Sequence, residues 1–288
     1  MIRFILASIA LCSSPLLLAQ DATRAFRIPT LYHVGYWVRD AAKARDFYEK
    51  YLGFEEPYVL NHADGTLQMV VIKVNERQVI YLFPDPSRIK PNGDNLDHLG
   101  LLVDNAAALH DTLIARGLKV GAPHLGHIGD LLMGVFDPDA HGFEMTQLEP
   151  EGQLLKHQGK NLPASRISSH LRSATIVASD LGASVAFYRD KLGFREIGKA
   201  GGAVRLQVPD GSDFIELVPA DRKGDAPGAR SVPQYTLAVP DAAKAAETLA
   251  ARSKSGDFPF PAPVSTAADG RRQTSVVDPD GTRIVLSE

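Results

Sequence analysis

The sequence predicts an α+β fold in which one β-α-β-β-β unit occurs four times, in two tandem domains. Two repeated motifs indicate the duplication: DFYEKYLGFEE at Asp46–Glu56 returns as AFYRDKLGFRE at Ala186–Glu196, and GVFDPDAHGFEM at Gly134–Met145 returns as VVDPDGTRIVL at Val276–Leu286. A chain of 288 residues has room for about two domains of roughly 100–200 residues each. We therefore assign one copy of the motif pair to each domain.

Residues 1–20 are predicted to be a secretory signal peptide and not part of the fold. Arg3 supplies one positive charge, and Phe4–Leu18 is an apolar run broken only by small hydroxyl residues. This run is shorter than the roughly 18 residues that a membrane span needs. We expect a periplasmic or secreted protein with no stable membrane insertion after leader removal, and an uncleaved anchor is the alternative.

The composition excludes several chemistries. Cys12 is the only cysteine and lies within the predicted leader, so the exported chain would have no disulfide, no cysteine nucleophile and no thiolate metal site. The formal net charge is −3, and no block of lysine and arginine stands out. This balance favours a small-molecule substrate and gives no support to a nucleic-acid partner.

The first domain is predicted to span residues 28–149. A β-rich run at Tyr32–Val38 precedes a helix at Ala41–Gly53, whose apolar residues recur at helical spacing and whose last residue is a glycine. A second helix is expected at Ala106–Arg116. The remaining strands are expected at Thr66–Val74, Gln78–Phe83, His98–Val103, Leu131–Phe136 and Gly142–Gln147.

A polar segment at residues 150–169 lacks apolar periodicity and is predicted to be the linker. The second domain, residues 170–288, repeats the pattern of the first. Its helices are expected at Gly182–Gly193 and Asp241–Arg252, and its first strand at Leu171–Ala178.

The first strand, the FYxxxLGF helix end, the DPD hairpin before the last strand and the doubled β-α-β-β-β plan together resemble the vicinal oxygen chelate superfamily. Glyoxalase I, bleomycin-resistance proteins and type I extradiol dioxygenases belong to this superfamily. The resemblance covers nearly the whole chain after the leader. It implies that each domain is an incomplete barrel made of two paired units, and it says less about the reaction.

The resemblance places metal ligands at His33, His98 and Glu144. Two histidines and one carboxylate are typical of non-haem Fe(II), so Fe(II) is favoured, and Mn, Ni, Co or Zn suit similar donors. Strand alternation places Gly35 on the face of His33 and Gly100 on the face of His98. We expect these small residues to leave room over the metal.

The two copies differ at these positions. Ser173, Gln234 and Val285 occupy the corresponding places in the second domain, which is therefore predicted to lack the metal. A complete ligand set forms only if the two units within residues 30–149 pair with each other. The second domain is then expected to support the first.

Two further residues could act on a substrate. Tyr81 could donate a hydrogen bond to a bound oxygen, with a packed strand tyrosine as the alternative. His127, in the glycine-rich loop Gly121–Gly129, could act as a general acid or base, with an exposed loop histidine as the alternative. The acid that is a fourth ligand in glyoxalases would fall on Tyr81 here and on Glu216 in the second domain.

The resemblance implies an extradiol-dioxygenase-like oxidoreductase that acts on a small, vicinally oxygenated substrate of the catechol type. Two departures leave alternatives open: Gly134 stands where the extradiol signature has a tyrosine, and the ligand set is in the first domain and not the second. A metal-dependent lyase, isomerase or epimerase is the first alternative, and a non-catalytic small-molecule binding protein is the second. The protein could also form a homodimer.

Overall fold

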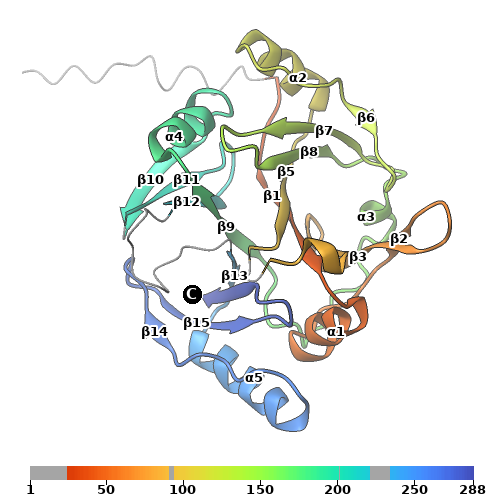
Figure 1. Cartoon of the computed structure of the whole chain (residues 1–288), viewed down its shortest axis with the longest axis vertical. Helices are drawn as coiled ribbons and strands as arrows, with labels where there is room; N and C mark the ends of the chain where they lie inside the picture. Colours follow the sequence, from red (N-terminus) through yellow and green to blue (C-terminus); the bar gives the residue numbers. More distant parts are fainter. Residues whose placement is uncertain (1–24, 91–93, 201, 221–233) are drawn as a thin grey trace, which may run out of the picture.

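The computed structural model describes residues 25–90, 94–200, 202–220 and 234–288. The predicted signal peptide, residues 1–20, lies outside the described residues. Within them, no helix is long and apolar enough to cross a membrane. Two curled, mixed sheets of eight strands each account for the two predicted domains (Figure 1).

Domain 1 has one sheet with the strand order β2-β3-β4-β1-β5-β8-β7-β6. The first four of these strands come from the first unit and the last four from the second, so the predicted pairing of contiguous units is confirmed. The strands are β1 (Thr30–Val38), β2 (Val59–Asn61), β3 (Leu67–Asn75), β4 (Gln78–Pro84), β5 (Leu96–Leu102), β6 (His124–Leu125), β7 (Leu131–Phe136) and β8 (Gly142–Gln147). The helices are α1 (Ala41–Arg45), the π-helix η1 (Asp46–Tyr51), the 3₁₀-helix η2 (Pro86–Arg88) and α2 (Ala106–Ala115).

Domain 2 repeats this order as β10-β11-β12-β9-β13-β16-β15-β14. Its strands are β9 (Leu171–Ala178), β10 (Arg195–Ala200), β11 (Ala203–Gln207), β12 (Phe214–Pro219), β13 (Gln234–Ala238), β14 (Ser265–Thr266), β15 (Arg272–Val277) and β16 (Arg283–Ser287). Its helices are α4 (Leu181–Asp190) and α5 (Ala242–Ser255).

The predicted linker is partly structured: it contains the short helix α3 (Gln153–Lys156) and packs against domain 1. Leu154 is fully buried. The fully buried ammonium group of Lys73 donates hydrogen bonds to the main-chain oxygens of His157 and Lys160 at 2.6 and 2.9 Å. Burial of a lysine requires such partners, so this contact fixes the segment on β3.

Local sequence signals begin and end the helices. The side chains of Asp40, Asn105, Asp180 and Asp241 each accept hydrogen bonds from main-chain N–H groups of the first turn of α1, α2, α4 and α5. Gly53 and Gly193, in the repeated Leu-Gly-Phe motif, have φ of 78° and 81°. Glycine adopts this left-handed conformation at low cost, which ends both helices.

The expected single helix at Ala41–Gly53 differs from the structure, which changes to a π-helix after Arg45. The Leu52 N–H donates to the Phe47 carbonyl, five residues earlier. The wider turn buries Phe47, Tyr48 and Tyr51 together. Periodicity of 3.6 residues does not reveal a π-helix, because tertiary burial of the aromatic residues decides it.

The two domains meet through a reciprocal pair of contacts that joins the repeated motifs. Tyr188 of α4 donates to Asp137 of the domain 1 DPD turn at 2.8 Å, and Tyr48 of η1 donates to Asp278 of the domain 2 turn at 3.4 Å. All four side chains are buried. Each FY motif therefore hydrogen-bonds the DPD motif of the other domain.

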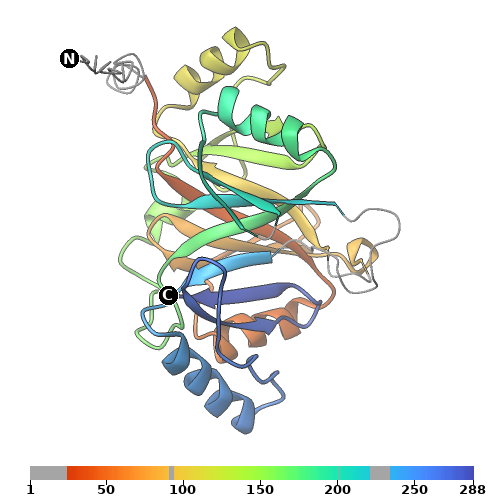
Figure 2. The same cartoon turned by 90° about the vertical axis from the view of Figure 1, so that its left-hand side faces the viewer.

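The same pseudo-twofold relation continues along the interface. Asp280 accepts from the Arg39 N–H, and Asp139 accepts from the Ser179 N–H. Arg252 of domain 2 donates to the Tyr51 carbonyl, and Arg116 of domain 1 donates to the Lys191 carbonyl, each at 2.6 Å. Accordingly, α2 and α4 lie together at one end of the molecule, and α1 and α5 lie together at the other (Figure 2).

We expect Tyr188→Phe to lower the free energy of unfolding by about 2 kcal/mol, because it removes a buried hydrogen bond to a charged carboxylate. Tyr51→Phe is the matched control, since its hydroxyl donates to the neutral carbonyl of Pro259 at 2.7 Å. The control should lose only about 1 kcal/mol. Urea unfolding measures both free energies. An equal decrease in the two variants would contradict the larger contribution that we assign to the Tyr188–Asp137 hydrogen bond.

Candidate metal centre

Three side chains of domain 1 converge on the concave side of the sheet. His33 of β1, His98 of β5 and Glu144 of β8 each offer one ligand atom, and these atoms lie within 4.8 Å of one another. The Oε2 of Glu144 is 3.4 Å from the Nε2 of His33 and 3.6 Å from the Nε2 of His98. The structure thus brings together the three residues for which the sequence predicted metal binding.

A bulge in β1 shapes the position of His33. The pairing of β1 with β5 shifts register between Leu31 and His33. Leu31 and Val34 pack in the main core, whereas Tyr32 belongs to the apolar cluster on the concave side. The bulge therefore allows the neighbouring residues Tyr32 and His33 both to lie on the concave side of the sheet, which simple strand alternation does not allow.

Asp97 orients His98. Its Oδ2 is 2.7 Å from the His98 Nδ1, which leaves the Nε2 to face Glu144. A second register shift, between Gly35 and Tyr36, lies opposite this stretch of β5. Histidine ligands commonly have such a carboxylate on their other nitrogen, which fixes the ring and its tautomer.

Glycines opposite the histidines make room for the imidazole rings themselves, a role that the sequence did not predict for them. His33 pairs with Gly100 across the ladder, and a Cβ at Gly100 would lie 2.3 Å from the His33 ring. Gly35 pairs with His98, and its Cβ would lie 3.2 Å from that ring. The residue directly opposite on the neighbouring strand therefore decides this packing.

The chemistry of the donor set fits a divalent cation. His33 is completely buried, and neither of its ring nitrogens has a hydrogen-bond partner among the described residues. Burial, and then the charge of His98, lower the pKa of His33 well below its ordinary value, so the ring is neutral and can bind a metal. A buried imidazole without a partner costs free energy, and a metal ion held with His98 and Glu144 would offset that cost.

Tyr81 of β4 covers the His33 ring, with 4.2 Å between the ring centroids. Its hydroxyl donates to the Tyr32 hydroxyl at 3.2 Å. Burial, and then the charge of Tyr32, raise the pKa of Tyr81 far above its ordinary value. Tyr81 therefore stays neutral and can orient groups by hydrogen bonding, but it cannot act as a base near neutral pH.

A cavity of about 190 Å³ opens at the cluster. Tyr81, His98, Glu144 and the predicted His127 all line it, and most of the other walls are apolar: Leu60, Met69, Phe83, Ile128 and Leu132. His127 itself is exposed. Such an apolar cleft with a few convergent polar groups is typical of a small-molecule site.

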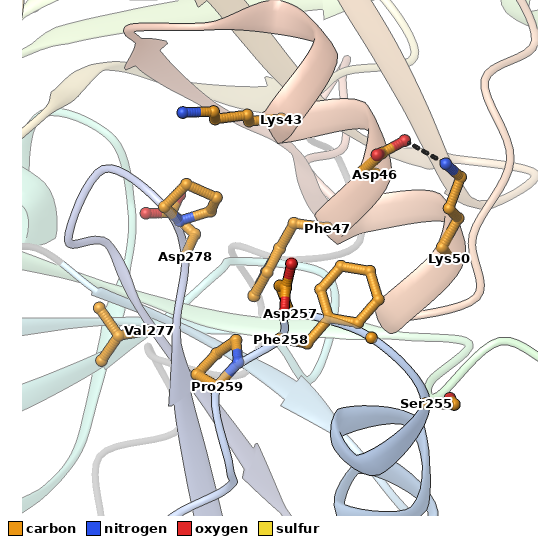
Figure 3. A pocket seen from close by; sticks show the side chains of 12 residues that line it. Lys43, Asp46, Phe47, Lys50, Ser255, Asp257, Phe258, Pro259, Val277 and Asp278 are labelled. Atoms are coloured by element: carbon orange, nitrogen blue, oxygen red, sulfur yellow. Dashed lines mark ion pairs between the residues drawn. The ribbon is translucent and has the colours of Figure 1, made fainter.

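A larger cavity, of about 760 Å³, lies at the domain junction (Figure 3). Phe47 and Lys50 of η1 line one side of it, and Phe258 and Pro259 of domain 2 line the other. None of the three clustered residues lines this cavity, and Lys50 is paired with Asp46 at 2.7 Å. We assign the functional site to the smaller cavity, because only that one carries the donor set.

Strand register in domain 2 gives the equivalents of the three ligands. Ser173 and Thr236 pair as His33 and Gly100 do, and Thr236 pairs with Val285 as Gly100 pairs with Glu144. Gln234 is then the equivalent of His98, because it precedes Thr236 by two residues as His98 precedes Gly100. Within the described residues, the one cluster able to hold a metal is that of domain 1.

Comparisons with known proteins agree with this fold. The family model of the "Glyoxalase/Bleomycin resistance protein/Dioxygenase superfamily" matches residues 30–145 and 170–286. The chain belongs to this superfamily, with one match in each of its two domains. A search of curated proteins finds no match.

Solved structures of two kinds resemble the chain. The Mn(II)-bound glyoxalase from Novosphingobium aromaticivorans has a TM-score of 0.66 and 18% identity, over 91% of this chain and 82% of that one. The 2,3-dioxygenase LapB from Pseudomonas sp. KL28 has a TM-score of 0.67 and 15% identity, over 91% and 92%. A catechol 2,3-dioxygenase has a TM-score of 0.67 and 14% identity, over 91% and 88%. At these identities the likeness shows the shared fold.

We expect Gly100→Ala to displace His33 and to weaken metal binding at least tenfold, because the added Cβ would lie 2.3 Å from the ring and overpacking costs about 1–3 kcal/mol. Gly134→Ala is the matched control, since Gly134 also pairs with a strand that carries a ligand but its Cβ would meet nothing within 4 Å. Metal content and thermal unfolding measure both variants. Equal metal content in the two variants would contradict the packing argument.

We expect metal binding to release about one proton near neutral pH. Burial alone would lower the pKa of His98, but hydrogen bonds to Asp97 and Glu144 outweigh burial and raise the pKa to about 9. Below that pH the metal-free ring carries a proton that the metal must displace, so affinity should rise with pH up to about 9. Calorimetry in buffers of different ionisation enthalpy measures the release, and Asp97→Asn should reduce it.

Proposed function

We propose that this chain is a divalent-metal-dependent enzyme that oxidises a small substrate with two adjacent oxygen atoms, in the manner of an extradiol dioxygenase. The convergence of His33, His98 and Glu144 carries the proposal, because three protein donors leave other coordination positions for a substrate. Fe(II) is the favoured ion, and Mn, Ni, Co or Zn suit similar donors. A bound cation would polarise the substrate oxygens, and Fe(II) would add redox chemistry with O₂.

The cavity supports a planar aromatic substrate. Phe83 and Leu132 offer apolar surface beside His98 and Glu144, which suits the ring of a catechol. The neutral hydroxyl of Tyr81 would orient a substrate oxygen. His127, exposed at the cavity, would move a proton to or from the substrate as general acid or base.

A lyase, isomerase or epimerase is the second candidate function, and Gly134 favours it. This residue lies opposite Glu144 in the β7–β8 ladder, and the space beside it is open. The tyrosine of the extradiol signature is therefore not supplied from this position. A metal-free binding protein is the third candidate, and neutral His33, whose buried ring nitrogens make no hydrogen bond within the described residues, counts against it.

Metal analysis followed by oxygen uptake tests the proposal. We expect about one divalent ion per chain in protein purified without a metal-affinity tag, and loss of that ion in the His33→Ala, Glu144→Ala double variant. The matched control is Gln234→Ala, which changes the equivalent of His98 in domain 2 and should keep the ion. After anaerobic loading with Fe(II), the wild-type protein should consume O₂ with one or more members of a catechol panel.

The outcomes separate the three functions. Stoichiometric metal without O₂ uptake would overturn the dioxygenase and favour the lyase or isomerase. No stoichiometric metal, together with unchanged substrate binding in the double variant, would overturn both enzymes and favour the binding protein. We further propose that the leader at residues 1–20 directs export, so the reaction would take place in the periplasm or outside the cell.

A further inference from the structure

Domain 2 has a cavity of its own, of about 220 Å³, on the concave side of its sheet. Ser173, Gln234 and Val285 all line it, and these are the register equivalents of the three clustered residues of domain 1. The cavity therefore occupies the place that the candidate metal centre occupies in domain 1. The ligands are missing there, but the hollow remains.

The walls of this cavity differ from those of domain 1 in charge. Four of its lining residues are arginines, and the equivalent positions in domain 1 hold three uncharged residues and one acid. In order, Arg172, Arg205, Arg271 and Arg283 stand where domain 1 has Tyr32, Val71, Asp130 and Gly142. Positive charge is thus concentrated on one concave surface of domain 2, which we call the arginine cavity.

Only part of this charge is neutralised by the protein. Arg205 is paired with Glu216 at 2.9 Å and with Asp269 at 2.6 Å, and these are the two acidic residues that line the cavity. Arg172 donates to the main-chain oxygens of Ser287 and Glu288. The lining of the cavity thus holds four arginine side chains and two acidic ones.

Two arginines remain available for a ligand. Arg271 is exposed, and its one carboxylate contact, with Asp269, is shared with Arg205; Arg283 is exposed and has no carboxylate partner among the described residues. The like charge of Arg271, after burial, lowers the pKa of Arg172. Repulsion between these cations costs free energy that a bound anion would offset.

We propose that the arginine cavity binds a small multivalent oxyanion, with the shared chemistry of a phosphate or a compact tricarboxylate. Planar guanidinium groups hold such oxygens by paired, charge-assisted hydrogen bonds. Gln234, Thr236 and Gln273 line the same cavity and supply neutral hydrogen-bonding groups. The volume of about 220 Å³ admits a compact anion. This site is separate from the metal chemistry of domain 1.

Ligand-dependent thermal unfolding of the full-length protein tests the site. Inorganic phosphate and tricarballylate are the two probes, each titrated at an ionic strength held constant with chloride. We expect a saturable rise in Tm with a submillimolar Kd for at least one probe, and the tighter probe identifies the source of the oxyanion. Arg283→Gln and Arg271→Gln should each weaken binding about tenfold, the usual effect of losing one charged hydrogen bond.

Arg272→Gln is the matched control, because Arg272 is an exposed neighbour of Arg271 that does not line the cavity. It removes the same charge and should leave Kd unchanged. The His33→Ala, Glu144→Ala variant should also bind normally. A rise in Tm that does not saturate, or an equal loss of affinity in Arg272→Gln, would overturn the proposal. Loss of binding in the His33→Ala, Glu144→Ala variant would also overturn it, because that result would place the anion in domain 1.

Discussion

The buried hydrogen bond between a helix tyrosine of one domain and a turn aspartate of the other is the contact on which the arrangement depends. Asp137 illustrates its role, because it accepts from the main-chain N–H groups of Asp139 and His141 and from the Tyr188 hydroxyl. Burial opposes the charge of Asp137, yet these donors and the ring of His141 hold its pKa below the ordinary range. The Asp137 carboxylate thus stabilises the turn and hydrogen-bonds it to domain 2.

This turn leads directly into the strand that carries Glu144 of the candidate metal centre. Phe143 packs edge-on against Tyr188, with 5.3 Å between the ring centroids, and Glu144 follows it. Domain 2 therefore contributes none of the three clustered side chains but packs against both the turn and the strand on which Glu144 lies. This pairing explains why both motifs recur, because the FY motif of each domain hydrogen-bonds the DPD motif of the other.

The internal repeat predicted two domains, and the resemblance to the vicinal oxygen chelate superfamily predicted the gathering of His33, His98 and Glu144 and, with it, the pairing of contiguous units. Strand register carried this information, since equivalent positions of the copies recur along each strand. Asp97 could not be predicted as a partner of His98, because neighbouring residues of a regular strand face opposite sides and only an irregular ladder brings them together. The role of Gly100 was missed for a related reason: its partner, His33, lies on another strand.

The two cavities show how one backbone supports two kinds of charge. In domain 1, burial favours the neutral form of His33, so this ring can offer a nitrogen lone pair to a cation. In domain 2, Arg205 brings a permanent positive charge into the equivalent hollow, and Glu216 and Asp269 compensate it. A guanidinium cannot lose its proton in the way that an imidazole can. The arginines therefore suit the concave face of domain 2 to the anion that we propose, whereas the donor set of domain 1 suits a cation, and both faces have the same strand order.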